Sequence, residues 1–123
     1  MLGKHDLMAF VATTNPAKAR PFYEDILGLA VTASDNYAIT FDANGIRLRL
    51  ATVREKSTAP YSILSWVVPD IHAIIAALVA KGVKFEVYDG FGQDEAGVWT
   101  APGGTQVAWF KDPDGNLLSL TQF

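Results

Sequence analysis

The 123-residue chain contains no cysteine, which excludes disulfide bonds, thiolate metal sites and cysteine nucleophiles. Basic residues are also few: 10 lysines and arginines stand against 13 acidic residues and form no basic run, which argues against a nucleic acid or an anionic membrane as partner. No stretch approaches the roughly 20 apolar residues of a membrane span. Residues Met1–Asp6 lack the apolar segment of a signal peptide, so we expect a cytoplasmic protein.

The chain instead contains one order of elements written twice. Residues 8–50 and residues 63–120 each have the pattern of a strand, an amphipathic helix and further strands, and each copy ends in a turn followed by a strand. The spacings differ between the copies, so the repeat is one of architecture. Two paired copies of such a unit form a cleft, and clefts of this kind bind small molecules.

Capping residues and apolar patterns predict the individual elements. Asn15-Pro16 opens the first helix and Gly28 ends it, while Asp70 caps the second helix and Gly82 ends it. Apolar and alternating runs between turn-forming residues predict strands over 7–12, 29–32, 37–41, 46–52, 63–68, 83–88, 98–101, 106–111 and 117–122.

The length is that of one domain, so we expect residues 1–123 to form a single unit of two modules. Module one covers 5–53 and module two covers 62–123. The segment 54–61 between them is polar and carries a proline, and we interpret it as a linker.

Four segments of the chain resemble the vicinal oxygen chelate superfamily, which includes glyoxalase I, bleomycin-resistance and fosfomycin-resistance proteins, and extradiol dioxygenases. These segments are Phe10–Thr13, Ala19–Leu29, Trp66–Ile71 and Val107–Asn116. The resemblance covers nearly the whole chain. It implies an α+β fold of two βαβββ modules that form a cupped mixed sheet with helices on the outer face, and a homodimer. It implies little about the reaction, because this fold supports many chemistries.

Metal-dependent members of this family place His or Glu at four inward positions, on the first and last strands of each module. The resemblance puts these positions on Met8, Arg49, Ile63 and Ser119. None is a good ligand for a divalent metal, because a thioether suits soft Cu(I), a guanidinium cannot coordinate and isoleucine has no donor atom. We therefore predict no metal and no other cofactor.

Alternation along the strands predicts which side chains face the cup. If Met8 faces it, so does Phe10, while Ile63 and Ser65 share one face of their strand. The opposite, helix-facing sets are uniformly apolar, whereas the cup-facing sets mix apolar, hydroxyl and guanidinium groups. A mixed concave surface suits an organic ligand with a few polar handles.

Arginines on one strand leave two interpretations open. Arg47 and Arg49 share the face of their strand that is predicted to line the cup. Arg49, more than Arg47, is a candidate to bind a carboxylate, phosphate or enolate oxygen of a ligand. The alternative is that both reach water or pair with an acid, because an unpaired guanidinium is costly to bury.

The glycine-rich loop 89–97 also permits two interpretations. It is either a lid over the cup, with Asp94 or Glu95 as a general base and Trp99 stacking on the ligand, or a solvated surface loop. We expect both histidines, His5 and His72, to lie on the surface, and Trp109 can face either way.

The sequence favours a metal-independent small-molecule-binding protein of the glyoxalase/bleomycin-resistance type, with an aromatic or amphipathic ligand in the cup and no residue assigned to catalysis. The alternative is a glyoxalase-like lyase or isomerase, or a dioxygenase-like enzyme, with a non-standard metal site or an acid–base pair such as Arg49 with Glu95. A scaffold with a vestigial cup is a third possibility. The predicted ligand-binding residues are Met8, Phe10, Arg49, Ile63, Ser65, Asp94, Glu95, Trp99 and Ser119.

Overall fold

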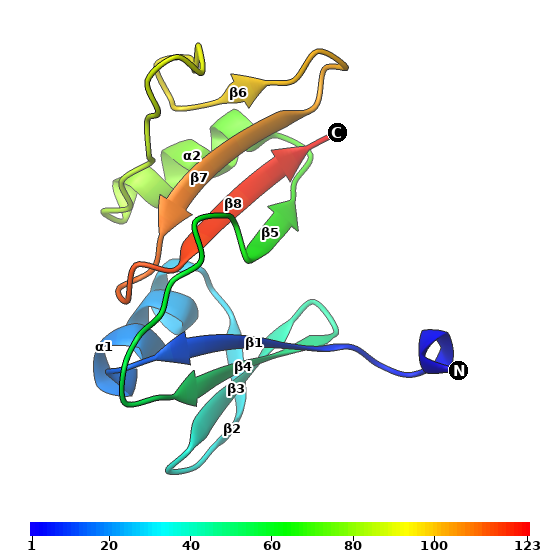
Figure 1. Ribbon diagram of the computed structural model, residues 1–123, viewed down its shortest axis with the longest axis vertical. Helices are drawn as coiled ribbons and strands as arrows, with labels where there is room; N and C mark the ends of the chain where they lie inside the picture. The colour runs from blue at the N-terminus through cyan, green and yellow to red at the C-terminus, as the bar shows by residue number, and fades with distance from the viewer. The chain divides into compact units, whose positions relative to one another are not determined.

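The computed structural model describes residues 1–123, which divide into two compact units, Met1–Ser57 and Thr58–Phe123. The division falls inside the segment 54–61 that the sequence marks as a linker. Each unit is a mixed four-stranded sheet with a helical segment (Figure 1). The predicted α+β class and the two βαβββ modules are therefore confirmed. Neither unit has a helix with the length and apolar character needed to cross a membrane.

The first unit has the strand order β1-β4-β3-β2, in which β1 and β4 are parallel and the other pairs are antiparallel. Phe41 on β3 is fully buried and packs against Tyr23 at a ring-centroid distance of 5.8 Å, so the helical segment covers this face of the sheet. The elements are η1 (Leu2–Lys4), β1 (Met8–Thr13), α1 (Pro16–Pro21), η2 (Phe22–Ile26), β2 (Ala30–Ser34), β3 (Ala38–Ala43) and β4 (Ile46–Thr52).

The first predicted helix is present but changes type at its centre. The Asn15 side chain accepts a hydrogen bond from the amide of Lys18 at 3.3 Å, as expected of a cap. The α-helical part ends at Pro21, which has no amide hydrogen to continue the ladder. A π-helical turn follows, and the Leu27 amide donates to the Phe22 carbonyl at 2.9 Å.

The second unit has the strand order β5-β8-β7-β6, with β5 and β8 parallel. Its elements are β5 (Leu64–Val67), α2 (Ile71–Ala80), β6 (Trp99–Thr100), β7 (Gln106–Lys111) and β8 (Leu117–Gln122). Asp70 caps α2 by accepting from the Ala73 amide at 3.2 Å, and the Ile71 amide donates to the Gln122 side chain at 2.8 Å. Helix α2 lies along β7 and β8 (Figure 1), over the buried residues Ala108, Phe110, Leu118 and Leu120.

The predicted strand 83–88 is wrong, because only Phe85 forms a bridge, to Phe110 on β7. The reason lies in the side chain of Gln93, which accepts from the Tyr88 amide at 2.7 Å and donates to the Glu86 carbonyl at 3.0 Å. This side chain satisfies backbone groups that a strand would otherwise offer to a neighbour. The edge of β7 is therefore shared between Phe85 at one end and β6 at the other.

Candidate ligand-binding site

Aromatic side chains gather on the face of the second unit's sheet that lies opposite α2. Trp109 belongs to this face, because its neighbours on β7, Ala108 and Phe110, are fully buried on the helix side. The Trp109 ring lies 6.2 Å from the ring of Trp99, 6.1 Å from that of Phe91 and 5.7 Å from that of Tyr88, measured between centroids. We call these residues the aromatic cluster: Tyr88, Phe91, Trp99 and Trp109.

A cavity of about 260 Å³ opens beside the aromatic cluster. Leu117 on β8 lies on the same face as Trp109, and the segment that precedes β5 supplies the remaining wall. The surface is mostly apolar, and Ser62 is its one non-aromatic polar side chain. The cavity is lined by Pro60, Tyr61, Ser62, Tyr88, Phe91, Trp109 and Leu117.

Hydroxyl groups form two pairs on this same face, one between β8 and the segment that precedes β5 and one between β5 and β8. The oxygens of Ser62 and Ser119 are 2.8 Å apart, and those of Ser65 and Thr121 are 2.7 Å apart. Ser119 is opposite Trp109 in the register of β7 and β8 and is only 3% exposed. The predicted residues Ser65, Trp99 and Ser119 therefore share one face with the cavity. Ile63, half-buried, precedes β5 and its amide donates to the Leu117 carbonyl at 2.9 Å.

The predicted residues of the first unit also share one face of their sheet. Phe10 on β1 is opposite Arg49 on β4, and Met8 is opposite Arg47. Phe10 is 58% exposed, whereas Arg49 is half-buried and its side chain forms no hydrogen bond or ion pair. Backbone amides and then the Arg49 guanidinium hold the pKa of the Asp35 carboxyl below its usual range, so Arg49 already has an acidic neighbour. The anion-binding role of Arg49 stays a prediction.

Comparisons with known proteins fix the family. The model of the Glyoxalase/Bleomycin resistance protein/Dioxygenase superfamily matches residues 6–120. The chain belongs to this superfamily. No curated protein matches the chain in sequence.

Several solved structures of the superfamily share the fold. A glyoxalase family protein from Enterococcus faecalis aligns with a TM-score of 0.78 at 19% identity, covering 98% of this chain and 99% of that one. The fosfomycin resistance protein FosX from Listeria monocytogenes gives 0.77 at 13% identity, over 98% and 93% of the two chains. Lactoylglutathione lyase from Agrobacterium tumefaciens gives 0.75 at 16% identity, over 97% and 93%. At these identities the likeness concerns the fold.

The four positions to which the resemblance assigns a metal carry side chains that do not fit a divalent metal. Met8 and Arg49 lie in the first unit, and Ile63 and Ser119 lie in the second. Thioether, guanidinium, alkyl and neutral hydroxyl groups are a poor donor set for such an ion. The structure also contains no group of three or more His, Asp or Glu side chains that could hold a metal.

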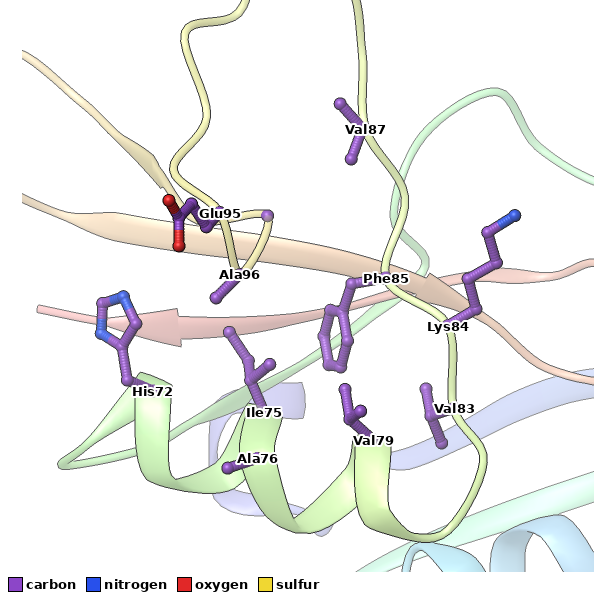
Figure 2. Close-up of a pocket in the computed structure, with 11 residues that line it drawn as sticks. His72, Ile75, Ala76, Val79, Val83, Lys84, Phe85, Val87, Glu95 and Ala96 are labelled. Carbon is purple, nitrogen blue, oxygen red and sulfur yellow. The ribbon is translucent and has the colours of Figure 1, made fainter.

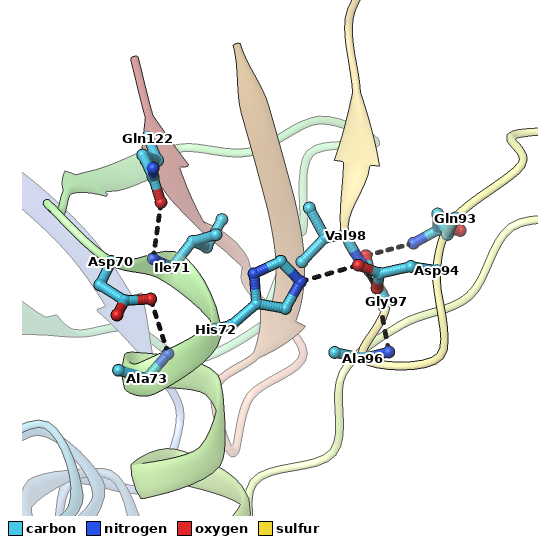
Figure 3. Close-up of polar contacts among 10 residues, drawn as sticks. All are labelled: Asp70, Ile71, His72, Ala73, Gln93, Asp94, Ala96, Gly97, Val98 and Gln122. Carbon is cyan, nitrogen blue, oxygen red and sulfur yellow. Dashed lines mark hydrogen bonds and ion pairs between the residues drawn. The ribbon is translucent and has the colours of Figure 1, made fainter. Parts of the chain in front are cut away.

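The loop after Tyr88 is held by two side chains that bond to its backbone. Gln93 completes its set of contacts by donating to the Gly97 carbonyl at 2.8 Å. Asp94 accepts from the Ala96 amide at 3.0 Å and from the Val98 amide at 2.9 Å, and its other oxygen lies 2.7 Å from Nε2 of His72 (Figure 3). The loop that carries Phe91 of the aromatic cluster is therefore fastened to α2.

Neither predicted loop acid lies on the face of the aromatic cluster. Asp94 faces His72, and Glu95 lines a separate cavity of about 500 Å³ between α2 and Phe85 (Figure 2). Their ligand contacts stay predictions. His5 and His72 are both exposed, as expected.

The sequence did not single out Tyr61, Ser62, Tyr88 and Phe91 as site residues, nor assign Trp109 to a face. Tyr61 and Ser62 lie at the boundary between the expected linker and module two, Tyr88 precedes the loop 89–97, and Phe91 lies within it. One feature in the sequence points to the aromatic residues of this set: bulky aromatic side chains recur in segments that are otherwise polar and turn-rich. Such residues need a surface to pack on, and the exposed face of β7 provides it.

The Asp94 carboxylate makes the fastening of the loop sensitive to acid. Burial raises the pKa of Asp94, but the hydrogen bonds from His72, Val98 and Ala96 outweigh it and hold the pKa below its usual range. A carboxyl group with a lowered pKa stabilises the folded state above its unfolded pKa, and this contribution is lost as the pH falls through the folded pKa. We expect Asp94→Asn to lower the urea midpoint at neutral pH, and the difference from the unaltered protein to shrink below about pH 4.

Glu95→Gln provides the control for this experiment, because Glu95 is an exposed neighbouring carboxylate with no hydrogen bond in the structure. Its urea midpoint should follow that of the unaltered protein throughout the titration. If the urea midpoint of Asp94→Asn stayed below that of the unaltered protein by a constant amount from pH 6 to about pH 2, this would contradict the role of the ionised carboxylate.

Proposed function

We propose that this protein binds a small aromatic or amphipathic molecule, without a metal, on the face of its second module that carries the aromatic cluster. The observation that carries the proposal is the cavity beside Trp109, with aromatic walls and a serine hydroxyl at its surface. Small-molecule sites are concave and largely apolar, with a few polar groups that set orientation. Aromatic pairs also add about 0.5–1.5 kcal/mol beyond the area that they bury.

The volume of the cavity limits the size of the ligand. About 260 Å³ is slightly below the ~300–1,000 Å³ that is usual for ligand pockets, so a compound of one or two rings fits better than a large one. The fold by itself does not choose the ligand, because it is shared by proteins named as a resistance protein and as a lyase. The side chains around Trp109 must therefore select the ligand.

Two measurements test the proposal together. Untagged protein, purified without chelator or a nickel column, should contain far less than one metal ion per chain. Aromatic compounds should raise the unfolding temperature by mass action, by about 2.7 kcal/mol of stability at a concentration of 100 Kd, and should be recovered unchanged. EDTA should not alter the shift.

Other results would favour the enzymatic alternative. About one equivalent of nickel, zinc, manganese or iron per chain would contradict metal independence and favour a metal-dependent lyase, isomerase or dioxygenase. Consumption of the compound without a metal would favour acid–base chemistry. The homodimer and the cytoplasmic location stay predictions of the sequence, and sedimentation and cell fractionation would test them.

A further inference from the structure

The contacts of Ser62, which is half-buried, and of Ser119, which is buried, determine which hydroxyl of the pair donates. The Ser62 hydroxyl donates to the Leu64 carbonyl at 2.8 Å, and a serine hydroxyl has a single proton to donate. The 2.8 Å contact between Ser62 and Ser119 therefore requires Ser119 to be the donor. Ser62 is the member of the pair that lines the cavity, and with its proton donated to Leu64 its hydroxyl can only accept from a ligand.

The cavity has no cationic side chain that could bind an anionic ligand. No lysine or arginine lines it, and the nearby Lys111 on β7 pairs with Glu86, with Nζ and Oε1 3.3 Å apart. The hydroxyl groups of Tyr61 and Tyr88 can rotate to donate or accept, and so they do not select either kind of ligand. Among the lining hydroxyls, Ser62 has a set direction and can only accept from a ligand, whereas the Nε1–H of Trp109 can only donate.

From this arrangement we infer that the cavity takes an uncharged aromatic molecule whose O–H or N–H group donates to Ser62. This inference rests on the proposed function and adds the ligand class. An aryl ether in the same place would direct a lone pair at a lone pair, and an aryl carboxylate would lose its hydration without gaining a donor from Ser62. The contact at Ser62 therefore favours a ligand that donates over both of these.

The second hydroxyl pair provides a matched contrast. The oxygens of Ser65 and Thr121 lie 2.7 Å apart, and only one proton of this pair is needed for their mutual hydrogen bond. The pair lies on the same sheet face, but neither residue lines the cavity. Altering it should not change ligand choice at Ser62.

The test compares 2-naphthol, which has a donor, with 2-methoxynaphthalene and 2-naphthoate, which lack one. Affinities for the full chain are measured by isothermal titration calorimetry. We expect 2-naphthol to bind about three- to tenfold more tightly than 2-methoxynaphthalene, as one net hydrogen bond implies, and 2-naphthoate to bind most weakly. Ser62→Ala should remove the advantage of 2-naphthol. Ser119→Ala should keep it, since Ser62 still donates to Leu64, and Thr121→Val should also keep it.

The outcomes separate this inference from the proposed function. If 2-methoxynaphthalene binds as tightly as 2-naphthol, or if Ser62→Ala retains the preference, the inferred ligand class is overturned while aromatic binding stands. If none of the probes binds, the proposed function fails and the inference fails with it. If Ser62→Ala does not fold, which thermal unfolding would reveal, the ratio of the affinities of the unaltered protein for 2-naphthol and 2-methoxynaphthalene still tests the inferred ligand class.

Discussion

Replacing Trp109 with alanine is expected to weaken the binding of 2-naphthol by about 30-fold or more, the loss associated with a tryptophan at the centre of a contact surface. Trp109 is the ring that the other three members of the aromatic cluster approach, and it lines the cavity directly. Because it is half-buried on the open face of the sheet, the folded state should persist. Isothermal titration calorimetry measures the affinity, and circular dichroism verifies the fold.

Val107→Ala is the matched control for Trp109→Ala. Val107 lies on the same strand and the same face, is also half-buried, and does not line the cavity. The affinity of the Val107→Ala variant for 2-naphthol should change by less than about threefold, because the substitution removes little apolar surface that would contact the ligand. Equal affinities for Trp109→Ala and the unaltered protein would place the site elsewhere and contradict the proposed function.

Replacing the next residue, Phe110, with alanine is expected to lower the free energy of unfolding by about 3–5 kcal/mol. Phe110 has no exposed surface and packs against Phe85 at a centroid distance of 5.4 Å, so its removal leaves a cavity in the core under α2. Urea denaturation at neutral pH measures the loss. The fraction that remains folded should bind 2-naphthol with nearly unchanged affinity, because Phe110 faces away from Trp109's side of the sheet.

Phe110→Leu refines this second prediction. Leucine keeps most of the apolar volume, so this substitution should lower the free energy of unfolding clearly less than Phe110→Ala does. A cost below about 1 kcal/mol for Phe110→Ala would show that the core relaxes around the missing ring and would contradict the tight packing seen here. We therefore expect Trp109 to affect mainly ligand binding and Phe110 mainly stability, because successive side chains on a strand point to opposite faces.

Much of the local structure follows from short stretches of sequence. Asn15 and Asp70 predict the helix starts, because a capping side chain bonds to amides only a few residues away. The strand 46–52 lies where its alternating pattern predicts it. The unsuitability of Met8, Arg49, Ile63 and Ser119 as metal ligands also depends only on residue type and family position.

Features that depend on how a loop folds back on itself or on a helix were harder to predict. The apolar pattern of 83–88 is that of a strand, but the side chain of Gln93 bonds to the backbone there and interrupts it. Asp94 has the chemistry of a general base, yet its hydrogen bonds with His72, Ala96 and Val98 give it a structural role. Patterns within one segment do not contain these contacts, because they depend on how loops fold back.

The sequence by itself therefore determined the two-module architecture, the helix caps and the alternation of strand faces. Only the tertiary structure decided that Trp109 faces the cavity, and that Tyr61 and Ser62 meet it there. The physical reason is one of range. Caps and alternation depend on neighbours within a few residues, whereas the cavity joins residues 60–62, 88–91, 109 and 117 through the pairing of β5, β7 and β8.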